Sequence, residues 1–316
     1  SMHYKRSLHL SFDFLHLYCH LLGFFLVFLP FIYTIKMNPI EFLRKNHYRF
    51  LEQHSGHVPV SPGFHDIGGM YTSVSVTKRG IIDLPFHINR IYHQSIFLDF
   101  FKDNEENKQK LITLALRKCD EALSGHPLEE GLLILCCGKS FSPDYLLDVT
   151  SLFAAKPITI PPTSWNSVNQ ANERPYTVDF YPIQRIPAQV KYTRWVLERQ
   201  PLIDRREEGV QETIIYDEDN EGLRDHLTEG LTSTFYILLD DGKILMPPTD
   251  KILYGSIQRW IQFIAPLLHL HIIEEPITFP HLIHHAKGAF LTSSGRILQP
   301  IHKMKISKEI QSKHSV

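Results

Sequence analysis

Residues 226–248, HLTEGLTSTFYILLDDGKILMPP, contain the pattern on which the interpretation of the fold depends. In this stretch Glu229 lies in a Thr-Glu-Gly step, directly before the strand-like run STFYILLDDGKILMPP. Three further motifs surround it: QRIPAQVKYTRW at 184–195, ILYGSIQRW at 252–260 and GAFLTSSGRILQPI at 288–301. The C-terminal half therefore carries a lysine, a carboxylate and two serine-containing segments in a defined order.

Length and composition indicate two domains of ordinary size. The chain has 316 residues, 43% of them hydrophobic, so each domain can bury its own core. Lys and Arg number 33 and Asp and Glu 34, so no overall field attracts nucleic acid or an anionic membrane. This balance favours a small neutral or zwitterionic substrate. The four cysteines show neither C-x-x-C spacing nor a disulfide framework, which indicates a reducing compartment.

Residues 14–35, FLHLYCHLLGFFLVFLPFIYTI, form an apolar run without Lys, Arg, Asp or Glu. A bilayer span needs roughly 20 residues, so this run has the length of a signal anchor or of an uncleaved secretory signal. The alternative is a hydrophobic N-terminal extension ahead of Met37, and composition alone does not separate the two hypotheses. We expect residues 1–36 to lie outside the main fold of a cytoplasmic protein, with membrane association through residues 14–35 as the alternative.

The first half of the chain shows helix and strand patterns. Residues 38–55 are predicted as an amphipathic helix, capped by Asn38 with Pro39 in its first turn. Residues 68–84 alternate as the two strands of a hairpin do, with Lys-Arg-Gly at the turn. Residues 107–125 have helical spacing and end at a glycine.

A polar connection separates two predicted α/β domains. Residues 157–175, PITIPPTSWNSVNQANERP, are rich in Pro, Ser and Asn and lack an apolar period. We therefore place the boundary near Pro161, with a smaller domain at residues 37–161 and a larger one at 162–316.

At the four motifs the chain resembles the class IV, or fold-type IV, pyridoxal-phosphate-dependent aminotransferases. This family includes branched-chain and D-amino-acid aminotransferases and aminodeoxychorismate lyase. The resemblance covers most of residues 37–304 and is densest after Lys191. It implies a small α/β sandwich and a larger barrel-like α/β domain, with pyridoxal 5'-phosphate between them. It also implies a homodimer in which a loop of the partner closes each site.

The resemblance implies that Lys191 forms the Schiff base with the cofactor and moves the proton during the reaction. Glu229 follows Lys191 by 38 residues, slightly further than in the family, and the extra length falls in an acidic loop around residues 220–224. Glu212 begins the strand that precedes this loop. Glu229 takes the place of the carboxylate that keeps the pyridine nitrogen of the cofactor protonated.

The phosphate of the cofactor needs N–H donors at a helix start, hydroxyl groups and usually one arginine. By resemblance these are Ser256 and Ile257 at the start of a predicted helix, Ser294, and Arg90 in an H-x-x-R-(L/I)-x-x-S motif. The family often has Thr where Ile257 stands, so one hydroxyl is lost here. Ser256 could compensate for it.

Substrate residues are matched less closely. Tyr71 occupies the aromatic position of a family strand that lines the substrate pocket, but Thr72 replaces the usual Glu. Arg185 could bind a substrate carboxylate, or it could be an arginine at a domain rim. The family's Asn-Tyr pair after the lysine is absent, because Tyr192-Thr193-Arg194-Trp195 follows Lys191. This Lys-Tyr-x-x-Trp pattern resembles a divergent branch found in plants and microbes.

The favoured function is transfer of an amino group from an amino acid to a 2-oxo acid. An aminodeoxychorismate-lyase-like reaction and a non-catalytic relative of the family are the alternatives. The histidines of PHLIHHAKG (280–288) and LHLHII (268–273) lack a cysteine or carboxylate that would complete a tetrahedral set, so no metal site is expected. No Walker or dinucleotide-binding loop is present, and no nucleic-acid partner is expected.

Overall fold

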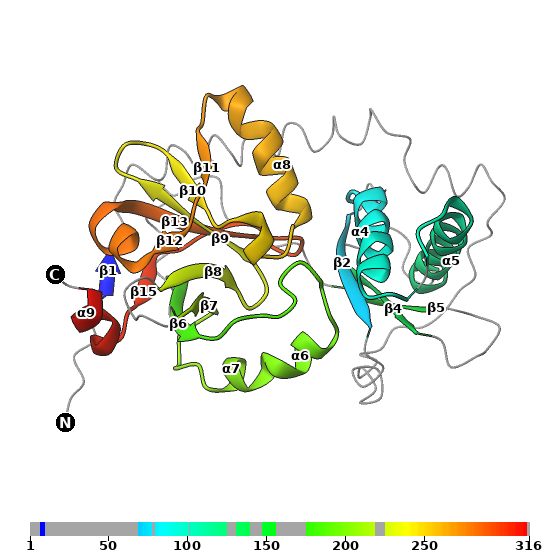
Figure 1. Cartoon of the computed structure of the whole chain (residues 1–316), viewed down its shortest axis with the longest axis horizontal. Coiled ribbons are helices and arrows are strands. Elements are labelled where there is room, and N and C mark those ends of the chain that lie inside the picture. The colour runs from blue at the N-terminus through cyan, green and yellow to red at the C-terminus, as the bar shows by residue number, and fades with distance from the viewer. Residues whose placement is uncertain are drawn as a thin grey trace. The chain divides into compact units, whose positions relative to one another are not determined.

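The computed structural model describes residues 7–9, 69–77, 80–100, 102–124, 131–139, 147–155, 175–218 and 225–314 (Figure 1). The chain divides into two units. Unit 1 comprises Ser1–Phe28, Ile160–Gln189 and Arg199–Val316, and unit 2 comprises Leu29–Thr159 and Val190–Glu198. The predicted apolar run at 14–35 and the predicted helix at 38–55 lie outside the described residues.

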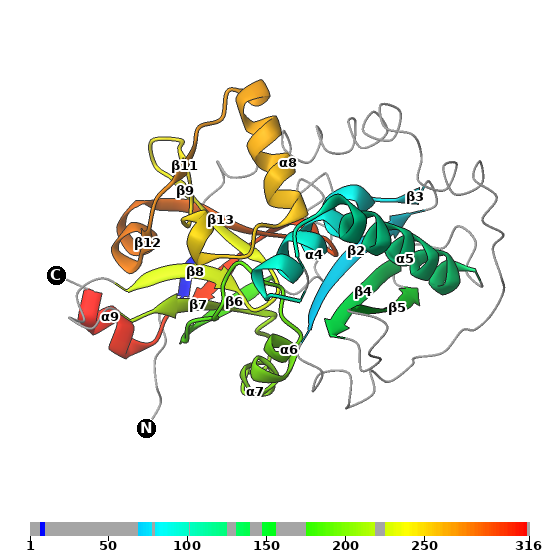
Figure 2. The same ribbon diagram turned by 45° about the vertical axis from the view of Figure 1, so that its right-hand side comes forward.

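Unit 2 contains an antiparallel sheet with two helices on one face. The strands follow the order β3-β2-β4-β5, and Figure 2 shows α4 and α5 packed together against them. The bounds are β2 (Met70–Thr77), β3 (Gly80–Ile81), α4 (Leu84–Phe97), α5 (Glu105–Leu123), β4 (Gly131–Lys139), β5 (Leu147–Ala155) and α6 (Arg194–Glu198). The hairpin predicted at residues 68–84 is present, since β2 pairs with β3.

The core of unit 2 follows from the alternation of β2. Met70, Val74 and Val76 are buried in one apolar cluster with residues of α4 and α5, among them Leu84 and Leu111. Because successive side chains of a strand point to opposite faces, Tyr71 and Ser73 lie on the other face of the sheet. One face of β2 therefore packs against α4 and α5, and the other carries Tyr71 and Ser73. The face on which a residue of β2 lies decides which predicted site residues it can contact.

Unit 1 contains a larger mixed sheet, in which the described strands number 11. The main path is β1-β15-β6-β7-β8-β9-β10-β11, with β12 beside β8 and the β13–β14 hairpin beside β9. Its strands are β1 (Ser7–His9), β6 (Thr177–Pro182), β7 (Glu212–Asp217), β8 (His226–Gly230), β9 (Thr234–Leu239), β10 (Ile244–Met246), β11 (Ile272–Glu274), β12 (Ile277–Thr278), β13 (Ala286–Ser293), β14 (Ile297–Pro300) and β15 (Lys303–Lys305). The pairs β15–β6, β6–β7 and β10–β11 are parallel.

Helices of unit 1 pack around this sheet, and α8 contacts β13. They are α7 (Gln200–Asp204), η1 (Thr249–Lys251), α8 (Ser256–Ile264), η2 (Ala265–Leu268), the π-helix η3 (His281–His285) and α9 (Lys308–His314). Phe279 lies at the centre of the core, with ring centroids 5.3 Å from Phe180 and 5.1 Å from Tyr216. His314 of α9 stacks on the same ring at 5.2 Å, so the C-terminal helix closes one side of the core.

Two features of the chain differ from the simple two-domain prediction. The predicted boundary near Pro161 lies close to the change of unit between Thr159 and Ile160, but Val190–Glu198 returns to unit 2. The short strand β1 at Ser7–His9 pairs with β15, within the stretch predicted to lie outside the main fold. Among the described residues no helix has the length and apolar character needed to cross a bilayer.

His302 generates a prediction about the pH dependence of folding. Burial lowers the pKa of His302 to about 4, and its Nδ1 accepts a hydrogen bond from the backbone N–H of Tyr176 at 3.1 Å. Because the folded pKa is below the unfolded pKa of about 6.5, this group contributes stability above pH 6.5 that is lost as the pH falls toward 4. Between pH 7 and 4.5 the wild type should lose about 2 kcal/mol more unfolding free energy than His302→Asn, measured with urea. An equal loss in both proteins would contradict this assignment.

Candidate functional site

Lys191 lies against β2 in unit 2, on the face of the sheet opposite α4. Its Nζ is 3.5 Å from the Ser73 Oγ and 4.8 Å from the ring centroid of Tyr71. The backbone N–H of Tyr71 donates to the carbonyl of Lys191 at 2.9 Å. The structure therefore brings together the predicted lysine and the predicted aromatic residue, with the amine over the ring face in a cation–π arrangement.

Two residues after the lysine, Thr193 joins this segment to the start of β2. The Thr193 N–H and hydroxyl both donate to the Gly69 carbonyl, at 2.8 and 3.0 Å, and the hydroxyl accepts from the Gly69 N–H at 3.1 Å. A Cβ at Gly69 would lie 2.3 Å from the carbonyl oxygen of Cys137, so only glycine allows the close approach of the two backbones. These contacts position Lys191 although 124 residues separate Gly69 and Thr193.

Arg90 lies on the α4 side of β2. Its Nη2 donates to the Thr72 Oγ1 at 2.5 Å and is 3.4 Å from the Nδ1 of His87. Thr72 and His87 are both buried, and their side chains are 2.7 Å apart. Thr72 stands where the resemblance expects Glu, so a neutral hydroxyl contacts the guanidinium at a position where the family has a carboxylate. The structure thus places Arg90 and Lys191 next to residues on opposite faces of one strand.

Glu229 and Arg185 form a buried ion pair in unit 1. The Arg185 Nε donates to Glu229 Oε1 at 2.6 Å, and the side chains are 5% and 7% exposed for Arg185 and Glu229. The second carboxylate oxygen accepts from the backbone N–H of Leu253 at 3.3 Å. Arg185 also donates to the carbonyl of Ala188. The sequence prediction related Arg185 to a substrate carboxylate and missed its pairing with Glu229, because 44 residues separate the two.

Three of the four residues predicted for the phosphate lie at the start of α8, namely Ser256, Ile257 and Ser294, whereas Arg90 lies in unit 2. The Ser256 and Ser294 hydroxyl oxygens are 3.2 Å apart, although 38 residues separate them in the chain. Gly255 precedes the helix in an extended conformation, and its N–H donates to the Gln258 Oε1 at 3.2 Å. Ile257 is buried, so its side chain packs in the core and only its backbone faces the helix start. Orphan N–H groups of a helix start beside two hydroxyls fit the phosphate of the implied cofactor.

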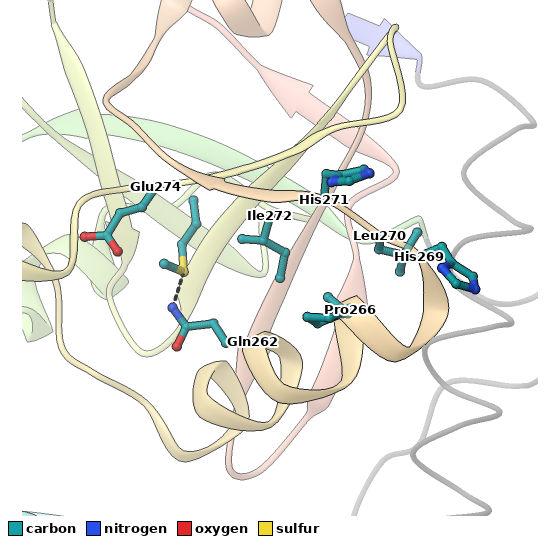
Figure 3. A pocket seen from close by; sticks show the side chains of 9 residues that line it. Gln262, Pro266, His269, Leu270, His271, Ile272 and Glu274 are labelled. Carbon is teal, nitrogen blue, oxygen red and sulfur yellow. Dashed lines mark hydrogen bonds between the residues drawn. The ribbon is translucent and has the colours of Figure 1, made fainter.

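A separate cavity of about 500 Å³ lies beside α8 and β11 (Figure 3). None of the predicted site residues lines it. Its lining consists of Met246, Gln262, Ala265, Pro266, His269, Leu270, His271, Ile272 and Glu274. The Oε1 of Glu274 accepts hydrogen bonds from the backbone and hydroxyl of Thr249, so this carboxylate is engaged outside the cavity. In the part of the chain that the structure describes, no three His, Cys, Asp or Glu side chains are grouped to hold a metal ion.

Comparisons with known proteins agree with this architecture. A model of the amino-transferase class IV family matches residues 69–304. No curated protein matches the chain.

Solved structures that are similar to this chain have low sequence identity. The branched-chain amino acid aminotransferase from Escherichia coli is 14% identical, with a TM-score of 0.58, covering 77% of this chain and 78% of that chain. A putative 4-amino-4-deoxychorismate lyase from Legionella pneumophila is 12% identical, with a TM-score of 0.57 and coverage of 79% and 87%. The PLP-bound form of a hypothetical aminotransferase from Mycobacterium tuberculosis is 14% identical, with a TM-score of 0.56 and coverage of 83% and 91%. The predicted α/β fold of fold-type IV is confirmed.

The Thr193–Gly69 contact generates a prediction about the stability of unit 2. Thr193→Val keeps the shape of the side chain but removes the hydroxyl, leaving the buried N–H and carbonyl of Gly69 with fewer partners. The unfolding free energy should fall by about 1–3 kcal/mol, measured by urea denaturation. Thr193→Ser, which keeps the hydroxyl, is the matched control and should lose less. A Val variant as stable as the wild type would show that the contact does not hold the segment.

Proposed function

The chain belongs to the amino-transferase class IV family, and we propose that it is a pyridoxal-phosphate-dependent enzyme that transfers an amino group from an amino acid to a 2-oxo acid. The observation that carries the proposal is the meeting of Ser256 and Ser294 at the start of α8. The sequence motifs predict both residues as phosphate ligands, and their hydroxyl oxygens are 3.2 Å apart although 38 residues separate them in the chain.

In unit 1 we assign three roles toward the cofactor. Ser256 and Ser294 hold the phosphate through their hydroxyls, and the backbone N–H of Ile257 adds a donor at the helix start. Glu229 holds a proton on the ring nitrogen of the cofactor. Arg185 fixes the orientation of Glu229, because it holds one carboxylate oxygen and leaves the other near Leu253. A direct contact of Arg185 with a substrate carboxylate stays a hypothesis.

In unit 2 we assign the covalent and proton-transfer roles to Lys191. When bound, pyridoxal phosphate supplies an aldehyde that a lysine amine can attack and a ring that withdraws electrons from the substrate Cα. The Lys191 Nζ then carries the proton that leaves or enters at this carbon. Tyr71 limits the positions of the amine through its ring face. Arg90 is the proposed partner of the phosphate, held by Thr72 and His87.

A lyase reaction of the 4-amino-4-deoxychorismate type is the second candidate. Structures of a putative lyase of this kind from Legionella pneumophila and of one from Pseudomonas aeruginosa have TM-scores of 0.57 and 0.54, near the 0.58 of the branched-chain aminotransferase. The same lysine and carboxylate would serve both reactions, so release of pyruvate from aminodeoxychorismate distinguishes them. The homodimer and the cytoplasmic location stay predictions.

The phosphate assignment predicts unequal effects of two substitutions. A charged fork donates more strongly than one hydroxyl, so Arg90→Ala should weaken cofactor binding by about 1.5–3 kcal/mol and Ser294→Ala by about 1 kcal/mol. Equilibrium titration with pyridoxal phosphate measures both. Arg117→Ala and Ser312→Ala change exposed residues of α5 and α9 and serve as matched controls. Negligible losses at both Arg90 and Ser294 would mean that the phosphate binds elsewhere.

Lys191 gives the sharpest test of the proposal. Borohydride treatment of the protein with cofactor should attach the pyridoxyl group to the peptide that contains Lys191, detected by mass spectrometry. Lys191→Ala should abolish this label, whereas Lys110→Ala, at an exposed lysine of α5, should keep it. Amino acids of the L and D series should change the visible absorption of the cofactor, and a 2-oxo acid should restore it.

Three results would decide against parts of this proposal. A label on another lysine contradicts the assignment of Lys191. A label on Lys191 with pyruvate release, but without amino transfer, favours the lyase. A label on Lys191 without either reaction favours a non-catalytic member of the family.

A further inference from the structure

Glu212 is a fully buried carboxylate at the first residue of β7, and the roles proposed above do not use it. Both of its oxygens accept several hydrogen bonds. Oε1 accepts from Arg206 Nη2 at 2.7 Å and from the Thr213 N–H at 3.1 Å, and Oε2 accepts from Thr232 Oγ1 at 2.6 Å, Arg296 Nη1 at 3.0 Å and Ser233 Oγ at 3.3 Å. The four side-chain donors lie outside β7. Arg206 lies in the segment before this strand, Thr232 and Ser233 lie between β8 and β9, and Arg296 lies between β13 and β14.

Oxygen Oε2 connects two turns that are far apart in the sequence. The first is the tight turn Gly230–Ser233, which follows Glu229 directly and is closed by the Gly230 N–H donating to the Ser233 carbonyl at 2.8 Å. The second is the turn between β13 and β14, which contains Ser294 and Arg296. One carboxylate oxygen therefore holds both the turn beside the proposed ring-nitrogen partner and the turn that carries a proposed phosphate hydroxyl.

Gly230 shows how closely the carboxylate packs against the first turn. A Cβ at this position would lie 2.3 Å from the Ser233 Oγ and 3.1 and 3.3 Å from the Cγ and Cδ of Glu212. Any other residue would force the Ser233 side chain to move and would crowd the Glu212 side chain. The close packing of Ser233 and Glu212 thus explains why a glycine follows Glu229, which the sequence pattern alone does not show.

The charges of the cluster favour an ionised Glu212. Burial acts to raise the pKa of Glu212, but the guanidinium groups of Arg296 and Arg206 and the hydroxyl of Thr232 together hold this pKa below its usual range. The two arginines and one carboxylate leave the group with a net charge of +1. Arg296 is half-buried, and its Nη2 also contacts the Thr232 hydroxyl at 3.3 Å.

We propose that Glu212 is a positioning residue, which fixes the Gly230–Ser233 and Ser294–Arg296 turns relative to each other and thereby sets the geometry in which Glu229 and Ser294 meet the cofactor. This inference rests on the proposed function for the identity of the cofactor. The anchoring of the two turns stands on the contacts of Glu212 alone. The residue acts through its neighbours and does not touch the cofactor itself.

The direction in which the affinity for the phosphate changes distinguishes a positioning role of Glu212 from a purely electrostatic one. Glu212→Gln removes one negative charge and raises the net charge of the cluster from +1 to +2. If Glu212 acted only as a nearby charge, this change would strengthen binding of a phosphate dianion. If Glu212 positions the turns, the change weakens binding, because Gln presents one uncharged acceptor oxygen instead of two and its hydrogen bonds with Thr232, Ser233 and Arg296 are weakened or lost.

The first measurement compares the affinity for pyridoxal phosphate with that for pyridoxal, which lacks the phosphate. Glu212→Gln should bind pyridoxal phosphate roughly tenfold or more weakly than the wild type, with a smaller change for pyridoxal. Glu207→Gln is the matched control, because Glu207 is half-exposed and pairs with Lys305 away from the two turns. It should bind both compounds as the wild type does.

The second measurement needs no cofactor. Hydrogen exchange followed by mass spectrometry should become faster in the apo form of Glu212→Gln at residues 231–233 and 294–296. The turn between β9 and β10, at residues 240–243, should keep its rate and serves as an internal reference. Arg296→Gln removes one of the same contacts from a half-buried position and should give the same pattern. The effects of the two substitutions on affinity should be less than additive if they act through this contact.

The outcomes separate this inference from the proposed function. If the wild type binds no pyridoxal phosphate, the proposed function fails, and the exchange rates alone decide whether Glu212 holds the turns. Unchanged exchange at both turns, or unchanged or tighter binding of pyridoxal phosphate by folded Glu212→Gln, overturns the positioning role. If Glu212→Gln does not fold, hydrogen exchange at the two turns in Arg296→Gln decides, because this substitution removes a positive charge and weaker phosphate binding would then follow from electrostatics alone.

Discussion

A buried carboxylate must be paired, since removing a charge from water without a partner costs several kcal/mol. Among the residues that the structure describes, unit 1 buries three acidic side chains, and each pairs with at least one basic residue from a distant part of the chain. The pairs are Glu212 with Arg206 and Arg296, Glu229 with Arg185, and Asp225 with Lys313 and His314. Two of these pairs lie beside proposed cofactor residues, and the third anchors α9. The need to pair buried charge thus connects the fold of unit 1 to its chemistry.

Departures from the family pattern have local explanations in the structure. Ile257 is buried at the start of a helix, where backbone N–H groups can donate to a phosphate. Replacement of the family's Thr by Ile257 therefore removes only one of several proposed phosphate donors. Thr72 contacts both Arg90 and His87, and its neutral hydroxyl does not compete with a phosphate for the guanidinium as a carboxylate would. The residues after Lys191 support the backbone, because Thr193 joins Gly69 and Tyr192 forms a bridge with Met70. These substitutions alter the surroundings of the proposed cofactor without removing the lysine.

The sequence predicted features that depend on local patterns. The hairpin at residues 68–84, the helix that starts at Ser256 and the fold class follow from alternation, glycine positions and family motifs. The partners of Glu212 and Arg185 could not be found this way. The ion pairs Arg296–Glu212 and Arg185–Glu229 join residues 84 and 44 positions apart, and a side chain leaves no mark of its distant partner in a single sequence. The addition of β1 to the sheet and the return of Val190–Glu198 to unit 2 are long-range for the same reason.

The assignment of Val190–Glu198 to unit 2 has a consequence for the order of folding. The rest of this unit ends at Thr159, so its last segment leaves the ribosome only after β6, a strand of the sheet of unit 1, has been synthesised. Contacts such as Gly69–Thr193 span 124 residues and form slowly, because a long loop must close before they gain any stability. Lys191 therefore reaches its place only after most of unit 2 has been synthesised. A nascent chain that stops short of it would carry most of unit 2 without the amine that is proposed to bind the cofactor.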